Sequence, residues 1–60
     1  MKNTIKILLV EDVPVAQKMA QMTLEELGHQ VDVAENGQTA VRLFKENKYD
    51  LVFMDLGLPD

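Results

Sequence analysis

"TIKILLVEDVP" (residues 4–14) joins a short apolar run to two acidic residues and a proline. Its first seven residues, 4–10, combine β-branched and apolar side chains over a length too short for a typical helix. The last four of these, 7–10, are all apolar, as expected of a strand buried on both faces of a parallel sheet. The stretch therefore predicts a buried strand over 4–10 that ends directly before Glu11 and Asp12.

A helical period begins at the proline. Asp12 is expected to act as the N-cap, Pro14 is tolerated in the first turn, and Gly28 supplies a left-handed C-cap. Met19 and Met54 are interpreted as core residues, because methionine fills irregular gaps in apolar interiors. Residues 14–27 are predicted to be helical because they place one stripe at helical spacing, formed by Ala16, Met19, Ala20, Thr23, Leu24 and Leu27.

The rest of the chain alternates between strand and helix. Residues 30–35, QVDVAE, alternate apolar with polar, which is typical of an edge strand that is wet on one face. The Asn36-Gly37 pair could close a hairpin, but Ala40, Val41 and Phe44 follow at helical spacing and favour a second helix over about 37–47. Residues 49–55, YDLVFMD, are predicted to be the third strand. The order βαβαβ predicts an α/β fold with a parallel sheet and right-handed crossovers.

Length and composition limit the possible functions. Sixty residues form at most one small domain, and a chain of this size buries only roughly 60% of its unfolded surface. The chain has no cysteine, which excludes disulfides and thiolate metal sites and is compatible with a cytoplasmic location. A net charge of −4 argues against direct nucleic-acid binding. The apolar run at 7–10 is too short for a signal peptide or a membrane span, so no membrane contact is expected.

Three acidic residues follow two of the predicted strands. Glu11 and Asp12 follow the first strand, and Asp55 ends the third. If these strands are neighbours, the three acids converge at the carboxyl end of the sheet, where strand order reverses and open α/β sheets bind ligands. Carboxylates held close together repel each other, and a hard divalent cation such as Mg²⁺ relieves that repulsion. One carboxylate could then attack a phosphoryl group and form an aspartyl-phosphate.

Each acid also has a purely structural interpretation. Asp12 could be only an N-cap, and Glu11 only a charge favourable to the helix dipole. Asp55 could merely begin the turn DLGLP. Their joint occurrence after the first and third strands favours a site. Lone His29 is interpreted as a surface partner of the helix dipole, and the turn EDVP lacks the glycines that a nucleotide-phosphate site requires.

Three segments resemble the receiver domain of two-component response regulators and hybrid histidine kinases: ILLVEDVP (7–14), LEELGHQVDVAENGQTAV (24–41) and YDLVFMDLGLPD (49–60). The resemblance covers essentially all 60 residues. It implies a flavodoxin-like, doubly wound parallel sheet whose five strands run in the order 2-1-3-4-5. By this resemblance, residues 1–60 are the N-terminal half of a receiver, with strand order 2-1-3 and without strands 4–5 and helices 3–5.

The same resemblance implies a site. Asp55 would be the phosphoacceptor, taking a phosphoryl group from phosphohistidine on a histidine kinase or histidine phosphotransfer domain. Asp12 and Asp55 would bind Mg²⁺ through their side chains, Gly57 through its backbone carbonyl, and Glu11 mainly through water. The hydroxyl residue after strand four and the lysine after strand five, which bind phosphoryl oxygens in this family, are not among the 60 residues. Receiver domains catalyse their own phosphorylation without being free-standing enzymes, and the parent chain could be a hybrid histidine kinase.

A self-associating assembly module without phosphotransfer is the alternative function. We expect that the 60-residue chain does not fold as a monomer, because the third strand would leave a sheet edge with unpaired backbone groups. A two-fold axis could pair two third strands antiparallel and give six strands in the order 2-1-3-3′-1′-2′.

Overall fold

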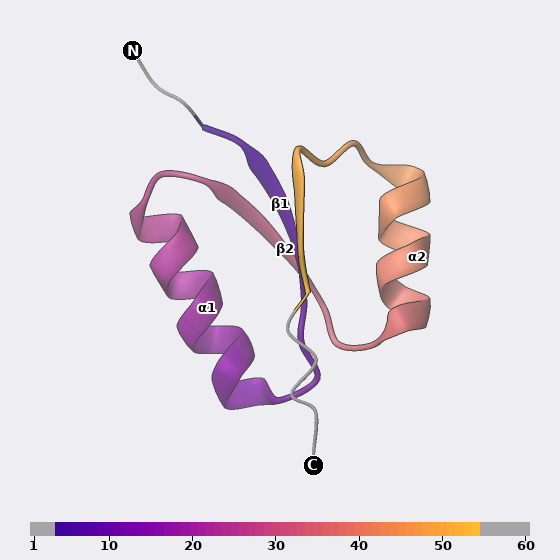
Figure 1. The fold of residues 1–60 in the computed structure, drawn as a ribbon, viewed down its shortest axis with the longest axis horizontal. Coiled ribbons are helices and arrows are strands. Elements are labelled where there is room, and N and C mark those ends of the chain that lie inside the picture. The colour runs from indigo at the N-terminus through magenta and orange to yellow at the C-terminus, as the bar shows by residue number, and fades with distance from the viewer. Residues whose placement is uncertain (1–3, 55–60) are drawn as a thin grey trace.

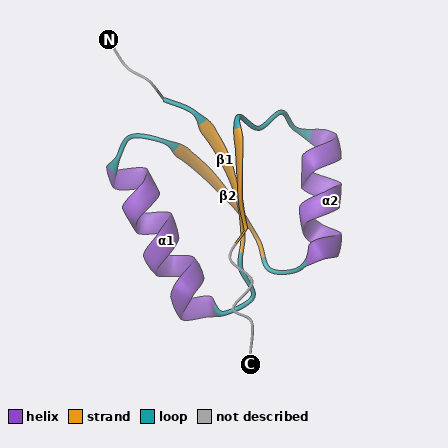
Figure 2. Cartoon of the chain, viewed as in Figure 1, coloured by secondary structure: helices purple, strands orange, loops and turns teal. Residues whose placement is uncertain are grey.

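The computed structural model describes residues 4–54 and places three parallel strands between two helices (Figure 1). The elements follow in the order β1 (Lys6–Val10), α1 (Pro14–Glu26), β2 (Gln30–Ala34), α2 (Gly37–Glu46) and β3 (Leu51–Met54). Figure 2 shows the sheet with α1 on one side and α2 on the other. The predicted βαβαβ order is confirmed, although β1 and β3 each begin two residues later than predicted.

The sheet has the strand order β2-β1-β3, so the predicted order 2-1-3 is confirmed and β2 is an edge strand. Both pairings are parallel. At the carboxyl end, Val10 is opposite Ala34 of β2 and Met54 of β3. All three strands therefore end at the same edge of the sheet, which is the edge where the acidic residues were expected.

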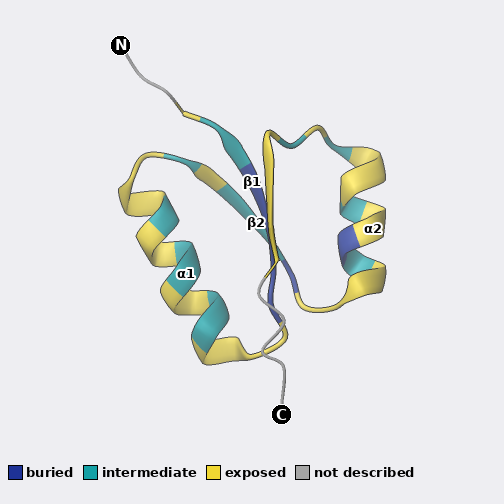
Figure 3. Ribbon diagram, viewed as in Figure 1, coloured by how far each residue is buried: buried dark blue, intermediate teal, exposed yellow. Residues whose placement is uncertain are grey.

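The centre of the core is β1. Ile7, Leu8 and Leu9 are almost completely buried, which confirms a strand covered on both faces (Figure 3). Leu8 and Val10 belong to a buried cluster on the α2 face, whose other members are Ala34 and Ala40 with Leu43 and Tyr49 packed against them. Because side chains alternate along a strand, Ile7 and Leu9 lie on the α1 face.

The third strand, predicted from an apolar run, is not buried by the described residues. All four side chains of β3 are between 38% and 57% exposed. The reason is that α1 and α2 pack over β1 and β2 and do not lie against β3. The assignment of Met19 and Met54 to the core is wrong. Met54 is 57% exposed because neither helix lies against β3, and Met19 is 64% exposed on α1.

The C-terminal end of α1 has the predicted glycine cap. Gly28 has a φ of +94°, in the left-handed region that glycine adopts without strain. Its N–H donates to the Glu25 carbonyl at 2.9 Å, and the His29 N–H donates to the Leu24 carbonyl at 3.3 Å. His29 was expected on the surface, but it is half-buried, and its Nδ1 accepts a hydrogen bond from the Ile5 N–H at 3.3 Å. It therefore joins the turn before β2 to the start of the central strand.

The Asn36-Gly37 pair begins a helix, as the helical spacing favoured. The Asn36 Oδ1 accepts a hydrogen bond from the Thr39 N–H at 2.8 Å, which satisfies one of the free donors of the first turn of α2. The hairpin alternative for this dipeptide is therefore excluded.

Tyr49 and Asp50 attach the beginning of β3 to the rest of the sheet. The Tyr49 hydroxyl donates to Oδ2 of Asp32 at 2.7 Å, and the Lys6 Nζ lies 5.3 Å from the centre of the Tyr49 ring. The Asp50 N–H donates to the Lys6 carbonyl at 2.8 Å, while the Lys6 N–H donates to Oδ2 of Asp50 at 2.8 Å. These bonds fix where β3 begins beside β1.

We expect Tyr49→Phe to remove a stabilisation that depends on pH. Burial, the hydrogen bond to Asp32, and the charges of Asp32 and Glu46 raise the pKa of Tyr49 from 10.0 to about 12. The folded chain favours the neutral phenol, so the raised pKa of Tyr49 adds to the free energy of unfolding. This stabilisation is complete below pH 10 and is lost as the pH rises toward 12. Denaturant unfolding at pH 8 should show Tyr49→Phe less stable by about 1 kcal/mol. That difference should shrink between pH 10 and 12, and a constant difference would contradict the assignment.

Candidate functional site

A hollow of about 370 Å³ opens at the carboxyl end of the sheet. It lies where β1 and β3 end and α2 begins, as the parallel topology predicts. Its lining is Val10, Asp12, Glu35, Asn36, Gly37, Ala40, Val41 and Met54. The hollow therefore brings together an acidic residue after β1, an acidic residue after β2 and the last residue of β3.

Glu11 is held firmly at this edge. It is only 3% exposed, and its N–H donates to the Ala34 carbonyl at 3.0 Å, which extends the pairing of β1 with β2. Its Oε2 accepts a hydrogen bond from the Val13 N–H at 3.0 Å. The Glu11 carboxylate therefore holds the turn that leads into α1. This hydrogen bond supports a role for Glu11 in positioning its neighbour Asp12.

Asp12 is exposed on the rim of the hollow and is not the N-cap of α1. The N-cap is Val13, whose side chain makes no capping hydrogen bond. The reason is Pro14, which occupies the first helical turn and favours an extended conformation in the residue before it. Val13 accordingly has φ −97° and ψ 117°, and Asp12 lies one residue too early to cap. The structural interpretation of Asp12 as a cap is therefore wrong.

Gln17 also belongs to this edge, and the sequence interpretation missed it. Its Nε2 donates to the Glu11 carbonyl at 2.6 Å, so the first turn of α1 is bonded to the end of β1. The sequence does place Gln17 in the first turn of the helix, directly after an acidic loop. A long amide side chain at such a position can donate a hydrogen bond to a free backbone carbonyl of the loop. Glu35 was likewise missed as a residue of the hollow, because it was assigned only to the end of a strand.

Asp55 and Gly57 lie outside the described residues, so their part in the site stays a prediction. Within residues 4–54, no three His, Cys, Asp or Glu side chains lie close enough together to hold a metal ion. Two acids, Asp12 and Glu35, line the hollow among the described residues, and Mg²⁺ is commonly held by one or two carboxylates together with several waters. Asp55 directly follows Met54, which lines the same hollow as Asp12.

The acidic residues that line the hollow carry oxygen donors, which are the ligands that a hard cation prefers. Asp12 and Glu35 line the hollow, and carboxylate oxygens suit Mg²⁺, which keeps several of its waters. Glu11 is not among the residues that line the hollow, and its Oε2 is bonded to the Val13 N–H, so its expected contact with a cation through water stays a prediction. The N-terminal end of α2 borders the hollow and partly offsets the concentrated negative charge.

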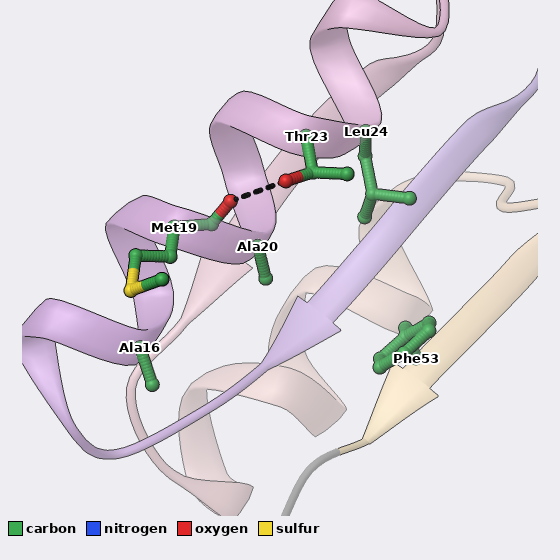
Figure 4. A pocket seen from close by; sticks show the side chains of 6 residues that line it. All are labelled: Ala16, Met19, Ala20, Thr23, Leu24 and Phe53. Carbon is green, nitrogen blue, oxygen red and sulfur yellow. Dashed lines mark hydrogen bonds between the residues drawn. The ribbon is translucent and has the colours of Figure 1, made fainter.

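A second hollow, of about 420 Å³, lies on the α1 face (Figure 4). Five residues of α1 and Phe53 of β3 line it, and Figure 4 shows the side chains of Ala20 and Leu24 extending from the helix toward the strands. The Thr23 hydroxyl donates to the Met19 carbonyl at 3.0 Å, within the helix. This hollow contains no charged side chain among its lining residues, so it does not provide chemistry of its own.

The chain matches one protein family and is similar in sequence to several known proteins. The response regulator receiver domain family matches residues 7–60. The aerobic respiration control sensor protein ArcB of Escherichia coli (strain K12) is 46% identical over 56 residues, which cover 93% of this chain and 7% of that protein. Probable histidine kinase 1 of Oryza sativa subsp. indica is 43% identical over 58 residues, covering 97% and 6%. Histidine kinase 5 of Arabidopsis thaliana is 43% identical over 54 residues, covering 90% and 6%.

The chain spans about 7% or less of the length of these curated relatives, so the similarity concerns one small segment of each. No solved structure matches the chain significantly. Neither of the helices among residues 4–54 has the length and apolar character needed to cross a membrane. The family match includes both the acidic pair after β1 and the segment that begins at Asp55. With its receiver topology and this match over residues 7–60, the chain belongs to the response regulator receiver domain family of two-component and hybrid histidine kinase systems.

Proposed function

We propose that this chain is the phosphoacceptor module of a two-component phosphorelay and that Asp55 receives the phosphoryl group. The observation that carries the proposal is the hollow shared by Asp12 and Met54, because Asp55 is the next residue in the chain after Met54. The family match supports it independently. The donor would be a phosphohistidine on a histidine kinase or on a histidine phosphotransfer domain, and the transfer would take place in the cytoplasm.

The proposed transfer is a substitution at phosphorus. An oxygen of the Asp55 carboxylate forms a P–O bond while the P–N bond of phosphohistidine breaks, and the imidazole nitrogen keeps the electron pair and takes up a proton. Asp12 and Asp55 would hold Mg²⁺ through their carboxylates, with the Gly57 carbonyl as a third ligand and Glu11 acting through water. Bound Mg²⁺ would supply positive charge that offsets the charge of the transferred group.

Hydrogen bonds within the chain hold the turn between β1 and α1 in place without a ligand. Glu11 fixes the turn through its bond to the Val13 N–H, and Gln17 fixes the same turn from α1. Asp12 is then presented from a restrained backbone, which lowers the entropy lost when it binds a cation. We propose that residues 1–60 correspond to the N-terminal half of the receiver fold, whose other half supplies the hydroxyl and lysine partners of the phosphoryl oxygens.

Phosphotransfer tests the proposal directly. The complete receiver domain that contains these 60 residues is incubated with Mg²⁺ and a histidine phosphotransfer domain that carries labelled phosphohistidine, and the label on each protein is followed with time. We expect label to move to the chain and to require Mg²⁺. A donor that keeps all of its label when the chain is in excess would contradict the proposal.

We also expect weak Mg²⁺ binding at this edge. Titration should shift the amide resonances of residues 10–13 and 54–58, and Asp12→Asn should reduce the affinity by removing one negative ligand. Glu26→Gln is the matched control, because it removes an exposed carboxylate at the far end of α1. The metal site is wrong if these amides do not shift at Mg²⁺ concentrations of roughly tens of millimolar, a generous range for a site with few protein ligands.

A second candidate function, a self-associating module without phosphotransfer, is favoured by one observation. The four apolar side chains of β3 are substantially exposed, and neither helix lies against this strand. The two functions make different predictions for the phosphotransfer experiment, because only the first requires label to reach the chain.

A further inference from the structure

Gln17 of α1 is bonded to the turn that precedes its own helix. Its N–H donates to the Val13 carbonyl at 2.8 Å, which is the ordinary bond of a first helical turn. Its Nε2 donates to the Glu11 carbonyl at 2.6 Å, beyond the beginning of the helix at Pro14. Gln17 is half-buried, and the described residues that line the hollow beside Asp12 do not include it. It therefore acts on this hollow through the backbone of the turn and not as a ligand.

The bond from Gln17 fixes one of the two peptide groups that flank Asp12. The Glu11 carbonyl and the Asp12 N–H belong to the same planar peptide group, so a bond to this carbonyl restrains the group that precedes the Asp12 Cα atom. The peptide group that follows this Cα atom ends in the Val13 N–H, which donates to Oε2 of Glu11 at 3.0 Å. Neither bond uses the Asp12 carboxylate. The backbone of Asp12 is therefore restrained on both sides, while its exposed side chain lines the hollow.

The Glu11 carbonyl depends on the Gln17 amide for its hydrogen bond from α1. Glu11 is only 3% exposed, so water has little access to this oxygen. A buried acceptor that loses its partner raises the free energy of the folded chain, and the peptide group lowers that cost by rotating toward another donor. Removing the Gln17 amide should therefore loosen Asp12, while the helix and the sheet keep their own backbone bonds.

We propose that Gln17 is a positioning residue that makes the cation site at Asp12 prefer Mg²⁺ to Ca²⁺, an inference that rests on the proposed function. The two ions differ in how strictly they require a fixed geometry. Mg²⁺ needs a nearly ideal octahedron of oxygen atoms at about 2.0–2.1 Å, whereas Ca²⁺ accepts about six to eight oxygen atoms at about 2.3–2.6 Å in flexible arrangements. A carboxylate on a restrained backbone suits Mg²⁺, and a carboxylate on a loosened backbone still suits Ca²⁺.

A purely structural role for Gln17 predicts a different result. If Gln17 only secured the first turn of α1, its loss would lower the free energy of unfolding and leave the preference between the two ions unchanged. A partly unfolded sample loses apparent affinity for both ions by the same factor, because only the folded fraction binds. The ratio of the two dissociation constants therefore separates positioning from stability, even in a destabilised variant.

Metal titrations of the complete receiver domain that contains these residues test the inference, with the amide resonances of residues 10–13 followed for each ion. Gln17→Met keeps the length of the side chain and removes the donor. We expect its Kd for Mg²⁺ to rise about three- to tenfold, as the loss of one hydrogen bond implies, and its Kd for Ca²⁺ to change by less than about twofold. Gln17→Asn is a second variant with the same expected result, because its amide is one methylene too short to reach the Glu11 carbonyl.

Gln21→Met is the matched control. It makes the same change one turn further along α1, where Nε2 of Gln21 donates to Oε2 of Glu25 at 3.2 Å, and it should leave both dissociation constants unchanged. An equal rise for both ions in Gln17→Met, or no rise for either, would overturn the inference and leave the proposed cation site intact. A wild-type domain whose amides at 10–13 do not respond to Mg²⁺ would instead contradict the cation site itself, and with it this role of Gln17.

Discussion

Leu9→Ala is expected to unfold most of the chain. Leu9 is completely buried in the central strand, between strands on both sides and on the α1 face of the sheet. Removing a buried leucine side chain costs about 2–5 kcal/mol, because apolar contacts are lost and a cavity remains. Whole domains are stable by only about 5–15 kcal/mol, and a chain of 60 residues is expected near the lower end. Far-ultraviolet circular dichroism and urea unfolding should show loss of the cooperative transition at 25 °C.

Leu27→Ala is the matched control for this experiment. It makes the same chemical change at the end of α1, where the leucine is 66% exposed, and should alter stability by less than about 0.5 kcal/mol. Equal effects of the two substitutions would mean that β1 is not the centre of the core. A cooperative transition retained in Leu9→Ala at the wild-type midpoint would have the same meaning.

Asp55→Asn is expected to abolish phosphoryl transfer to the chain. The amide has nearly the shape of the carboxylate, but it lacks the negative oxygen that forms the acyl phosphate. Label from the phosphohistidine donor should therefore stay on the donor at every time point. Circular dichroism of the variant should match the wild type, because an amide of nearly the same shape replaces one carboxylate.

Asp60→Asn provides the matched control, with the same substitution five residues further along the chain. It should accept label at the wild-type rate. If Asp55→Asn also accepted label at that rate, the phosphoacceptor would be another residue. Asp12→Asn should give an intermediate result, because it is proposed to hold the cation and not to receive the phosphoryl group.

The topology could be predicted because each element has a distinct period and length. The apolar run before Glu11 could only be a buried strand, and Gly28 marked the end of α1 in the conformation that the structure shows. The order β2-β1-β3 was implied by resemblance and is consistent with the parallel topology. The carboxyl end of the sheet then follows as the place for the hollow, since parallel strands all end on the same side.

The exposure of β3 could not be predicted from its residues. "LVFM" has the composition of a buried strand, and burial depends on whether other elements cover it. Residues 4–54 place both helices over β1 and β2. The contact of Tyr49 with Asp32 could not be predicted from the sequence either. It joins residues 17 positions apart, which only the crossover through α2 brings together.

Around the candidate site, the sequence predicted the edge of the sheet but not the roles of all its residues. Asp12 was correctly assigned to this edge, yet its role as a helix cap was excluded by the extended conformation that Pro14 favours in Val13. The anchoring of Glu11 by Gln17 depends on the exact turn between β1 and α1. Such a side chain-to-backbone bond leaves no periodic signal in the sequence.

Locating the transferred phosphoryl group within the wild-type chain is the most direct test of the proposed function. After transfer from the phosphohistidine donor, the chain is digested and each peptide is examined by mass spectrometry under conditions that preserve an acyl phosphate. We predict that the group is found on the peptide that contains residues 51–60, with fragmentation assigning it to Asp55. A phosphoryl group on any other residue, or none on a chain shown to be folded and supplied with Mg²⁺, would contradict the account.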